Sequence, residues 1–230
     1  MSTLGTTAQE STWEGFFGRM ALRGLRPAHV LDVGANRGHW TRTALKFFPD
    51  AAYTLVEPQQ QLRSSVEDLL QGGKVTWINA GVSDRPGRLA LTVAPDDTSS
   101  SFLPDAALAE RLGFRQVEVD VRTINELVAS SPWGIPDVVK IDAEGYDLKA
   151  LAGASELYGK TELFFVEAAV CAPLIENTMA AVIRRMDEIG YRMVDITDLN
   201  RSPRHGVLWL CELAFLRKSS PLLDGLSNYA

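Results

Sequence analysis

Cysteine is scarce in this chain. The 230 residues include only Cys171 and Cys211, too few for the disulfide framework of a small secreted domain. Long apolar runs are missing as well, since none reaches the roughly 18 residues of a membrane-spanning helix. The first residues lack the basic segment followed by an apolar one that marks a signal peptide. These absences predict a protein of the reducing cytoplasm with no membrane segment.

Positive charge is also in short supply. The chain has 23 Lys and Arg against 29 Asp and Glu, a formal net charge of −6. This balance argues against a broad nucleic-acid surface. A hydrophobic content of 46% suits a folded core, and the length suits one domain. The patterns divide the chain into a tail and leading helix at 1–26, a main domain at 27–218 and a tail at 219–230.

The clearest local pattern is a strand, a glycine turn and a helix. Residues 29–33 form an apolar run typical of a buried strand. Gly34 and Gly38 then interrupt it, and Trp40, Ala44 and Phe48 follow at helical spacing. Gly34 can adopt a backbone conformation closed to other residues and lets a ligand approach, while Gly38 lets the helix lie close to the sheet. The free N–H groups at the helix start suit an acidic ligand group.

Glu57 strengthens the prediction of a ligand site. The next predicted strand, residues 51–56, ends directly before it. An acidic residue at a strand end, about 20 positions after the glycines, can accept both hydroxyls of a ribose. The turn and Glu57 together predict a nucleoside-containing cofactor, although a tight turn without a ligand remains the alternative.

A group of carboxylates follows another buried strand. Asp142, Glu144 and Asp147 come directly after the strand predicted for residues 136–141. Crowded carboxylates repel one another, which is costly unless they have a task. Because ligands of open α/β sheets bind at the carboxyl ends of the strands, Asp142 and Glu144 should face the same cleft as Glu57. The alternative is that they only cap the next helix.

The remaining elements complete an α/β fold. Further strands are predicted at 74–79, 88–93, 116–121, 162–166, 191–196 and 207–216, further helices at 12–25, 58–70, 106–112, 121–130, 148–153 and 175–189, and long loops at 95–104 and 197–206. Two strands joined by a hairpin must be antiparallel. The sequence therefore predicts a mostly parallel, seven-stranded sheet with one antiparallel strand and helices on both faces.

Several of these motifs together resemble the FkbM family of S-adenosylmethionine-dependent methyltransferases. The motifs are DVGANRG at 32–38, Glu57 after the second strand, NAGVSD at 79–84 and VVKIDAEGY at 138–146. The resemblance covers about residues 29–217 and implies a Rossmann-like class I methyltransferase fold. Tyr146 and Asp147 depart from the family's more frequent small residue and Glu, and residues 197–206 do not align.

The resemblance implies transfer of a methyl group to oxygen. The acceptor would be a hydroxyl of a sugar, a polyketide or a similar small metabolite, and the second product would be S-adenosylhomocysteine. No nucleic-acid or membrane partner is expected. A homodimer remains open, because Trp13, Phe16 and Phe17 can serve either a core or an interface.

The resemblance also assigns roles to individual residues. Asp32, Gly34, Asn36 and Gly38 would hold the amino-acid end of the cofactor, Glu57 its ribose, and Ser83 and Asp84 its adenine end, with Asp142 also among the cofactor-binding residues. Methyl transfer then needs mainly orientation and removal of the acceptor's proton.

Asp142 is the first choice for the general base and Glu144 the second, with His205 and His39 as rivals. Lys140 would pair with Asp142 or Glu167. A magnesium ion bound by Asp142, Glu144 and Glu167 is a further alternative, but no metal is predicted.

Two other classes of function use the same features. A nucleotide-dependent oxidoreductase would need the same glycine turn and ribose carboxylate, although no second glycine fingerprint is present. A non-catalytic cofactor-binding module would keep the fold without the chemistry.

Overall fold

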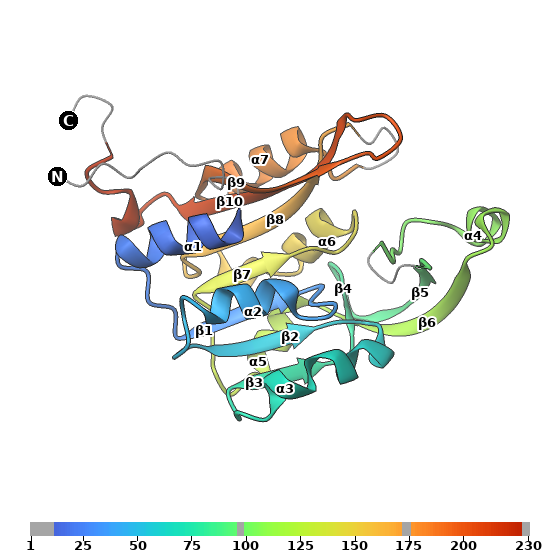
Figure 1. Ribbon diagram of the computed structural model, residues 1–230, viewed down its shortest axis with the longest axis horizontal. Helices are drawn as coiled ribbons and strands as arrows, with labels where there is room; N and C mark the ends of the chain where they lie inside the picture. Colours follow the sequence, from blue (N-terminus) through green and yellow to red (C-terminus); the bar gives the residue numbers. More distant parts are fainter. Residues whose placement is uncertain (1–11, 96–98, 172–175, 227–230) are drawn as a thin grey trace.

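The computed structural model describes residues 12–95, 99–171 and 176–226. Its centre is a seven-stranded sheet (Figure 1) with the order β3-β2-β1-β7-β8-β10-β9. The strands are β1 (His29–Val33), β2 (Ala52–Val56), β3 (Val75–Ile78), β7 (Val138–Ile141), β8 (Leu163–Ala169), β9 (Tyr191–Arg201) and β10 (Leu208–Arg217). β10 is antiparallel to both of its neighbours, and the other pairs are parallel. The predicted fold class is confirmed.

Helices cover both faces of this sheet. One face carries α1 (Trp13–Leu22), α2 (His39–Leu45) and α3 (Glu67–Leu70), the last preceded by the 3-10 helix η1 (Gln60–Val66). The other face carries α5 (Ile124–Ala129), α6 (Asp147–Ala152) and α7 (Met179–Glu188). Short 3-10 helices η2 (Ser155–Leu157) and η3 (Pro221–Leu223) complete the domain. No helix in the described ranges is long and apolar enough to cross a membrane.

Aromatic side chains hold the leading helix α1 to the domain. Phe17 is fully buried, and its ring lies 5.2 Å from that of Trp40 on α2 and 5.5 Å from that of Phe165 on β8, edge-to-face in both pairs. Phe16 packs on the same Phe165 ring at 5.4 Å. Each such pair contributes about 0.5–1.5 kcal/mol beyond the burial itself. Phe16 and Phe17 therefore belong to the core of this chain.

The central strands are buried on both faces. All residues of β1 and β7 are buried, as expected for strands covered by helices on either side. Two of these buried residues are charged, Asp32 on β1 and Lys140 on β7, and they are direct neighbours across the β1–β7 pair. Buried charges need partners, and these two lie next to the site described below.

A separate three-stranded sheet flanks the main one. It has the order β4-β6-β5 and consists of β4 (Gly81–Val82), β5 (Gly87–Val93) and β6 (Arg115–Arg122). The sequence predicts strands at 88–93 and 116–121, as a hairpin or an added edge strand, and in the structure they pair with each other in this separate sheet. Together with α4 (Ala106–Leu112), β5 and β6 project from the body as an arm (Figure 1).

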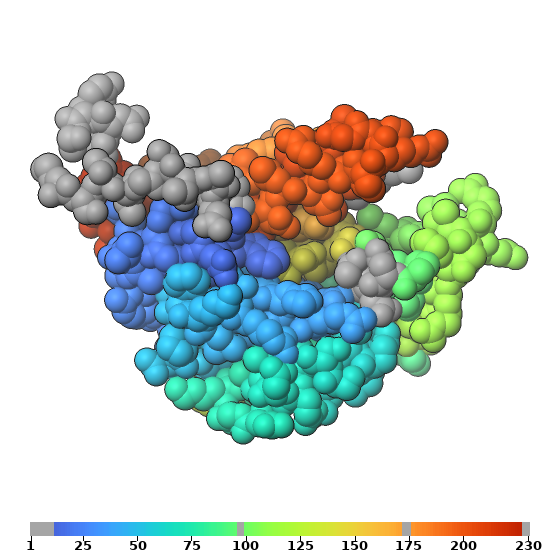
Figure 2. Space-filling model, in the orientation of Figure 1, coloured from blue at the N-terminus to red at the C-terminus, as the bar shows by residue number. Residues whose placement is uncertain are grey.

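The hairpin of β9 and β10 projects on the same side of the molecule. The first half of the predicted loop at 197–206 is strand, because β9 continues to Arg201 and pairs with Leu208 of β10. The outer residues of β9 are exposed and, apart from Leu199, polar, so the apolar alternation that marks a strand is absent there. In the space-filling view the surface is hollowed between this hairpin and the β5–β6 arm (Figure 2).

Candidate active site

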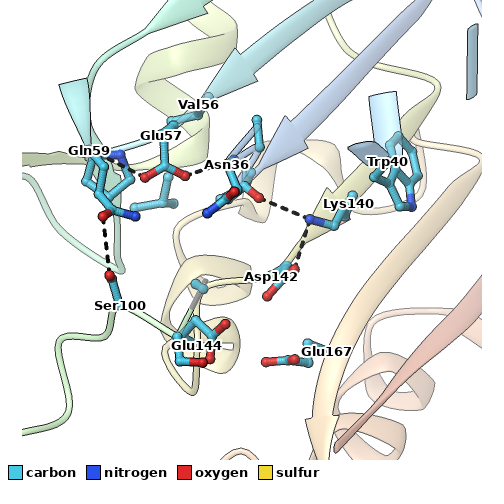
Figure 3. A pocket seen from close by; sticks show the side chains of 18 of the residues that line it. Asn36, Trp40, Val56, Glu57, Gln59, Ser100, Lys140, Asp142, Glu144 and Glu167 are labelled. Atoms are coloured by element: carbon cyan, nitrogen blue, oxygen red, sulfur yellow. Dashed lines mark hydrogen bonds and ion pairs between the residues drawn. The ribbon is translucent and has the colours of Figure 1, made fainter. Parts of the chain in front are cut away.

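A cavity of about 290 Å³ lies at the carboxyl ends of the parallel strands. Its walls come from the turn after β1, the residues after β2, the chain around β4, the loop after β7, the end of β8 and the β9–β10 hairpin. Glu57, Gln59, Asn36 and Ser100 gather on one side of it, and Asp142, Glu144 and Glu167 on another (Figure 3). The place is the one where open α/β sheets bind ligands.

Gly34 allows two stretches of chain to touch at this edge. Its φ is +74°, and a Cβ placed on it would lie 1.9 Å from the backbone oxygen of Asp142. Gly34 lines the cavity, but the missing Cβ makes room for the chain after β7 rather than for a ligand alone. The turn after β1 and the carboxylate loop after β7 are thereby joined.

Gly38 has a different task. It is the N-cap of α2 with a φ of +74°, and a Cβ there would meet Val66 at 2.9 Å and Leu69 at 3.1 Å. It lets α2 lie against η1 and α3, and it is not among the residues that line the cavity. Gly38 therefore sets the position of α2, whose first residue, His39, lines the cavity.

Glu57 is held in place by the backbone. One carboxylate oxygen accepts a hydrogen bond from the Asn36 N–H at 3.0 Å, and the other from the Gln59 N–H at 2.9 Å. Asn36 has a φ of +46°, a conformation that Asn tolerates better than most residues. Burial raises the pKa of Glu57, while the bonds from Gln59 and Asn36 and the charge of Lys140 oppose the shift. The carboxylate faces the cavity in a fixed orientation.

Lys140 is the cation at the centre of the site. Its Nζ lies 3.0 Å from Asp142 Oδ2 and 3.5 Å from Asp32 Oδ1, and donates to the Gly34 carbonyl at 3.2 Å. Burial alone would lower the pKa of Lys140, but the charges of Asp142, Asp32 and Glu212 raise it above its ordinary value. Lys140 is therefore an ammonium that joins β1, β7 and the turn after β1.

Asp32 lies beneath the cavity and does not line it. It is fully buried, and its Oδ2 accepts a hydrogen bond from the Thr41 hydroxyl at 2.5 Å. With Lys140 on its other oxygen, Asp32 ties α2 to the central strands. It lies too deep to face a ligand directly, so any influence on a cofactor passes through Lys140 and α2.

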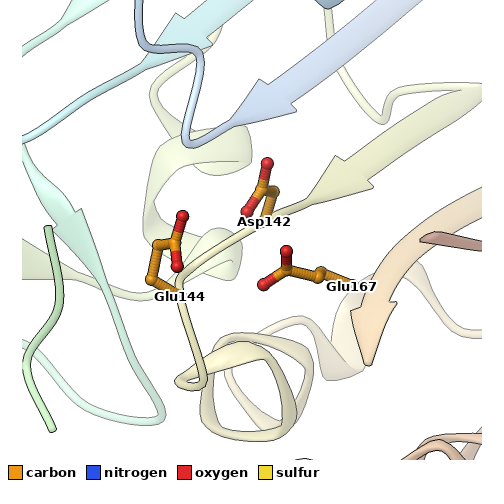
Figure 4. A group of neighbouring side chains, drawn as sticks. All are labelled: Asp142, Glu144 and Glu167. Atoms are coloured by element: carbon orange, nitrogen blue, oxygen red, sulfur yellow. The ribbon is translucent and has the colours of Figure 1, made fainter. Parts of the chain in front are cut away.

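Three carboxylates meet on one wall of the cavity. Oxygens of Asp142, Glu144 and Glu167 lie within 4.8 Å of one another, on the loop after β7 and on β8 (Figure 4). Burial raises the pKa of Glu167 well above its ordinary value, and the charges of Asp142, Glu144 and Asp147 add to the shift. Such a group of oxygens has the chemistry to accept a proton or to hold a hard cation.

Asp147 points away from this wall. Its two oxygens accept hydrogen bonds from the N–H groups of Ala143 and Gly145 at 2.9 and 3.1 Å, and from the Asn177 side chain at 2.9 Å. Burial raises the pKa of Asp147 to about 7. Of the three neighbouring carboxylates in the sequence, Asp142 and Glu144 therefore line the cavity, whereas Asp147 holds the backbone of the loop after β7. Glu167 from β8 joins the first two.

Ser83 and Asp84 lie just beyond the cavity. Ser83 is buried and donates to the Asp84 carboxylate at 3.0 Å, while Asp84 is exposed. The cavity wall at this point is instead made by Ala80, Gly81 and Val82.

The two histidines offered as bases take different places. His39 is exposed at the start of α2 and lines the cavity. His205 is exposed in the turn of the β9–β10 hairpin and is not among the lining residues. The structure therefore does not bring His205 together with the carboxylates.

Several lining residues are missing from the sequence-based prediction. Asp198 and Asn200 reach the cavity from β9, and Leu210 from β10. Asp198 and Asn200 are two positions apart, so on one strand their side chains point to the same face. This spacing would have indicated a shared polar face if residues 197–201 had been predicted as a strand. Ser99 and Ser100 line the cavity from the loop predicted at 95–104, of which residues 96–98 lie outside the described residues.

Glu212 continues the acidic wall into a smaller hollow shared with Asp142, Glu167 and Asp198. It stands directly opposite Glu167 in the β8–β10 pair and accepts a hydrogen bond from the Thr197 hydroxyl at 2.6 Å. Burial raises the pKa of Glu212 to about 7, against the opposing effect of Lys140.

The sheet order and the site at its carboxyl edge define a Rossmann-like class I methyltransferase fold. Similar solved structures include the precorrin-6y C5,15-methyltransferase of Geobacter metallireducens, at 13% identity and a TM-score of 0.50, covering 94% of each chain. Cofactor-bound Rv0187 from MTB is similar at 13% identity and a TM-score of 0.52, covering 96% of this chain and 84% of that one. A family model, the methyltransferase FkbM domain, matches residues 32–193. The chain belongs to this family. No curated protein matches it.

Proposed function

We propose that this protein is an S-adenosylmethionine-dependent O-methyltransferase that acts on a hydroxyl group of a small metabolite. The observation that carries the proposal is one cavity with two differently equipped walls. Glu57 is fixed at one wall by two backbone N–H groups, and three carboxylates meet at another. The wall with Glu57 suits the ribose of a nucleoside, and the wall with the three carboxylates suits removal of a proton from an acceptor.

The residues present fit the cofactor. Each oxygen of Glu57 keeps acceptor capacity beyond its one backbone bond, so the pair can accept both ribose hydroxyls. Gly34 and Asn36 present the turn after β1 to its amino-acid end, with Lys140 beneath the turn. Asp32 and Gly38 support that turn from below. Ala80 to Val82, rather than Ser83 and Asp84, would flank the adenine end.

S-adenosylmethionine supplies an activated methyl group on a positively charged sulfur. The chain must place the acceptor oxygen in line with that group and take its proton. Asp142, Glu144 and Glu167 are the carboxylates within reach of an acceptor in the cavity. His205 is not required for this scheme, since it lies outside the cavity wall.

Calorimetric titration of the protein with S-adenosylmethionine, S-adenosylhomocysteine and NAD tests the cofactor. Glu57→Ala should weaken binding of S-adenosylhomocysteine roughly tenfold or more, because a hydrogen bond to a charged group contributes about 1.5–3 kcal/mol. Glu188→Ala, an exposed residue at the end of α7, is the matched control. Tight NAD binding without binding of either adenosyl compound would favour the oxidoreductase alternative.

Labelled S-adenosylmethionine incubated with protein and a metabolite extract tests the reaction. We expect label in one or a few small molecules, identified by mass and by the methylated oxygen. Binding of the cofactor with no label transferred from any extract would favour the non-catalytic module.

A further inference from the structure

We propose that Glu167 on β8 is the catalytic residue that takes the proton from the acceptor hydroxyl, and that Asp142 acts as a positioning residue for Lys140. The inference rests on the proposed methyl transfer to oxygen. It replaces the first choice made from the sequence, which was Asp142. It follows from how the neighbours of the two carboxylates differ.

Asp142 is a poor candidate for a base because a cation is fixed beside it. Lys140 Nζ lies 3.0 Å from its Oδ2, and Lys140 is only 3% exposed. Asp32 and the Gly34 carbonyl hold the ammonium from the other side. The Oδ2 atom of Asp142 is thereby committed to the ion pair with Lys140 and is not free to accept a proton from a substrate hydroxyl. Asp142 is therefore suited to keeping Lys140 and the turn after β1 in place.

Glu167 has the opposite surroundings. Among the described residues, no Lys, Arg or His forms an ion pair with it, while Asp142 and Glu144 lie within 4.8 Å. Glu212 stands directly opposite on β10, on the same face of the sheet. Burial and the charges of Asp142, Glu144 and Asp147 raise the pKa of Glu167 well above its ordinary value, although the charge of Lys140 opposes the shift. A raised pKa makes the Glu167 carboxylate a stronger base.

The position of Glu167 also suits the step. Its carboxylate points toward Asp142 and Glu144 across the cavity wall (Figure 4). It belongs to a buried, paired strand, whereas Glu144 lies on the loop after β7 with a φ of +50°. Groups carried on strands are positioned more accurately than groups on loops.

The Glu167 carboxylate takes the hydroxyl proton as the acceptor oxygen forms a bond to the methyl carbon. The carbon–sulfur bond breaks, and its electron pair stays on the sulfur, which loses its positive charge. The products are a methyl ether and a neutral thioether, and Glu167 later returns its proton to water.

A direct titration tests Glu167 without any acceptor. Protein labelled with carbon-13 at glutamate side-chain carboxyls is titrated by NMR, and the Glu167 signal is assigned as the one missing in Glu167→Gln. The signal should titrate above the ordinary range of a glutamate and move toward that range in Asp142→Asn, which removes one neighbouring charge. Titration at or below the ordinary range would overturn the inference.

Kinetics with the acceptor found in the extract provide the second test. Glu167→Gln should lower the rate roughly 100-fold or more, as expected for loss of a general base, with unchanged affinity for S-adenosylhomocysteine. The fall in rate at low pH should disappear in Glu167→Gln and persist in Asp142→Asn. Glu188→Gln is the control and should match the natural protein.

Three further outcomes would overturn the assignment. The first is a Glu167→Gln rate within about threefold of the natural one, too small a loss for a base. The second is loss of the low-pH limb in Asp142→Asn instead. The third is activity abolished by EDTA and restored by Mg²⁺, which would make Glu167 a metal ligand. If the natural protein binds cofactor but transfers no label, the proposed function fails and this inference with it.

Discussion

A Cβ on Gly34 would lie 1.9 Å from the backbone oxygen of Asp142, so the turn after β1 and the loop after β7 are in direct contact. The same two stretches are joined by Lys140, which donates to the Gly34 carbonyl and pairs with the Asp142 carboxylate. The two best-defined motifs of the sequence are therefore one structural unit. Changing either stretch should disturb both walls of the cavity.

Gly34→Ala should be strongly destabilising. The methyl group would overlap the Asp142 carbonyl, and a φ of +74° is unfavourable for alanine. We expect a loss of more than about 2 kcal/mol in the free energy of unfolding, measured with urea. Gly72→Ala is the control, because nothing lies within 4 Å of its added Cβ and its φ is not positive. A Gly34→Ala protein as stable as the control would contradict the close contact.

Lys140→Met should lower the free energy of unfolding, because it leaves a buried negative charge without its partner. Asp32 is fully buried and would lose the cation 3.5 Å from its Oδ1. Removing one partner of a buried pair typically costs about 3–5 kcal/mol. Adding Asp32→Asn should recover part of the loss, because the remaining side chain is then neutral. Urea unfolding of the single and double variants measures this, and an additive further loss in the double variant would argue against the pairing.

Phe17→Ala should test the attachment of α1. Phe17 is fully buried and packs against the rings of Trp40 and Phe165. Removing a buried phenylalanine side chain typically costs about 3–5 kcal/mol. Leu22→Ala, at the exposed end of the same helix, should cost little, since Leu22 is 80% exposed. Thermal and urea unfolding of both variants decide whether α1 is part of the core or a loosely held extension.

Much of the fold follows from the sequence because its signals are local. The sheet type rests on buried apolar strands such as β1 and β7, and the helix predicted at 121–130 is present as α5, with Thr123 and Glu126 forming a local capping box at its start. The separate β4-β6-β5 sheet was not predicted, because alternation identifies a strand but not its partner. Residues 197–201 were missed as strand because four of the five side chains, in the run TDLNR, are polar and show no apolar alternation.

The site residues likewise differ in whether a local sequence signal identifies them. Glu57 and Asp142 could be found because a motif places each at a strand end. Glu167 and Glu212 come from strands far apart in sequence, and their opposition across β8 and β10 depends on register. The pairing of Lys140 with Asp142 rather than Glu167 also depends on three-dimensional geometry, and it alters which carboxylate can act as a base.

Glu212→Gln should change how stability depends on pH. The folded-state pKa of Glu212 is about 7, raised by burial, whereas the unfolded value is near the ordinary 4.3. The folded protein thus binds a proton more tightly, so the contribution of Glu212 to stability is present at low pH and is lost as pH rises through 7. Each pKa unit corresponds to about 1.4 kcal/mol.

Urea unfolding between pH 5 and pH 8 measures this effect as the difference between the two proteins. Because glutamine keeps an acceptor oxygen for the Thr197 hydroxyl but does not ionise, Glu212→Gln should gain stability relative to the natural protein as pH rises. Glu188→Gln, exposed on α7, should show no such trend. Parallel stability curves for the natural protein and Glu212→Gln would mean that Glu212 stays ionised throughout, held so by the charge of Lys140.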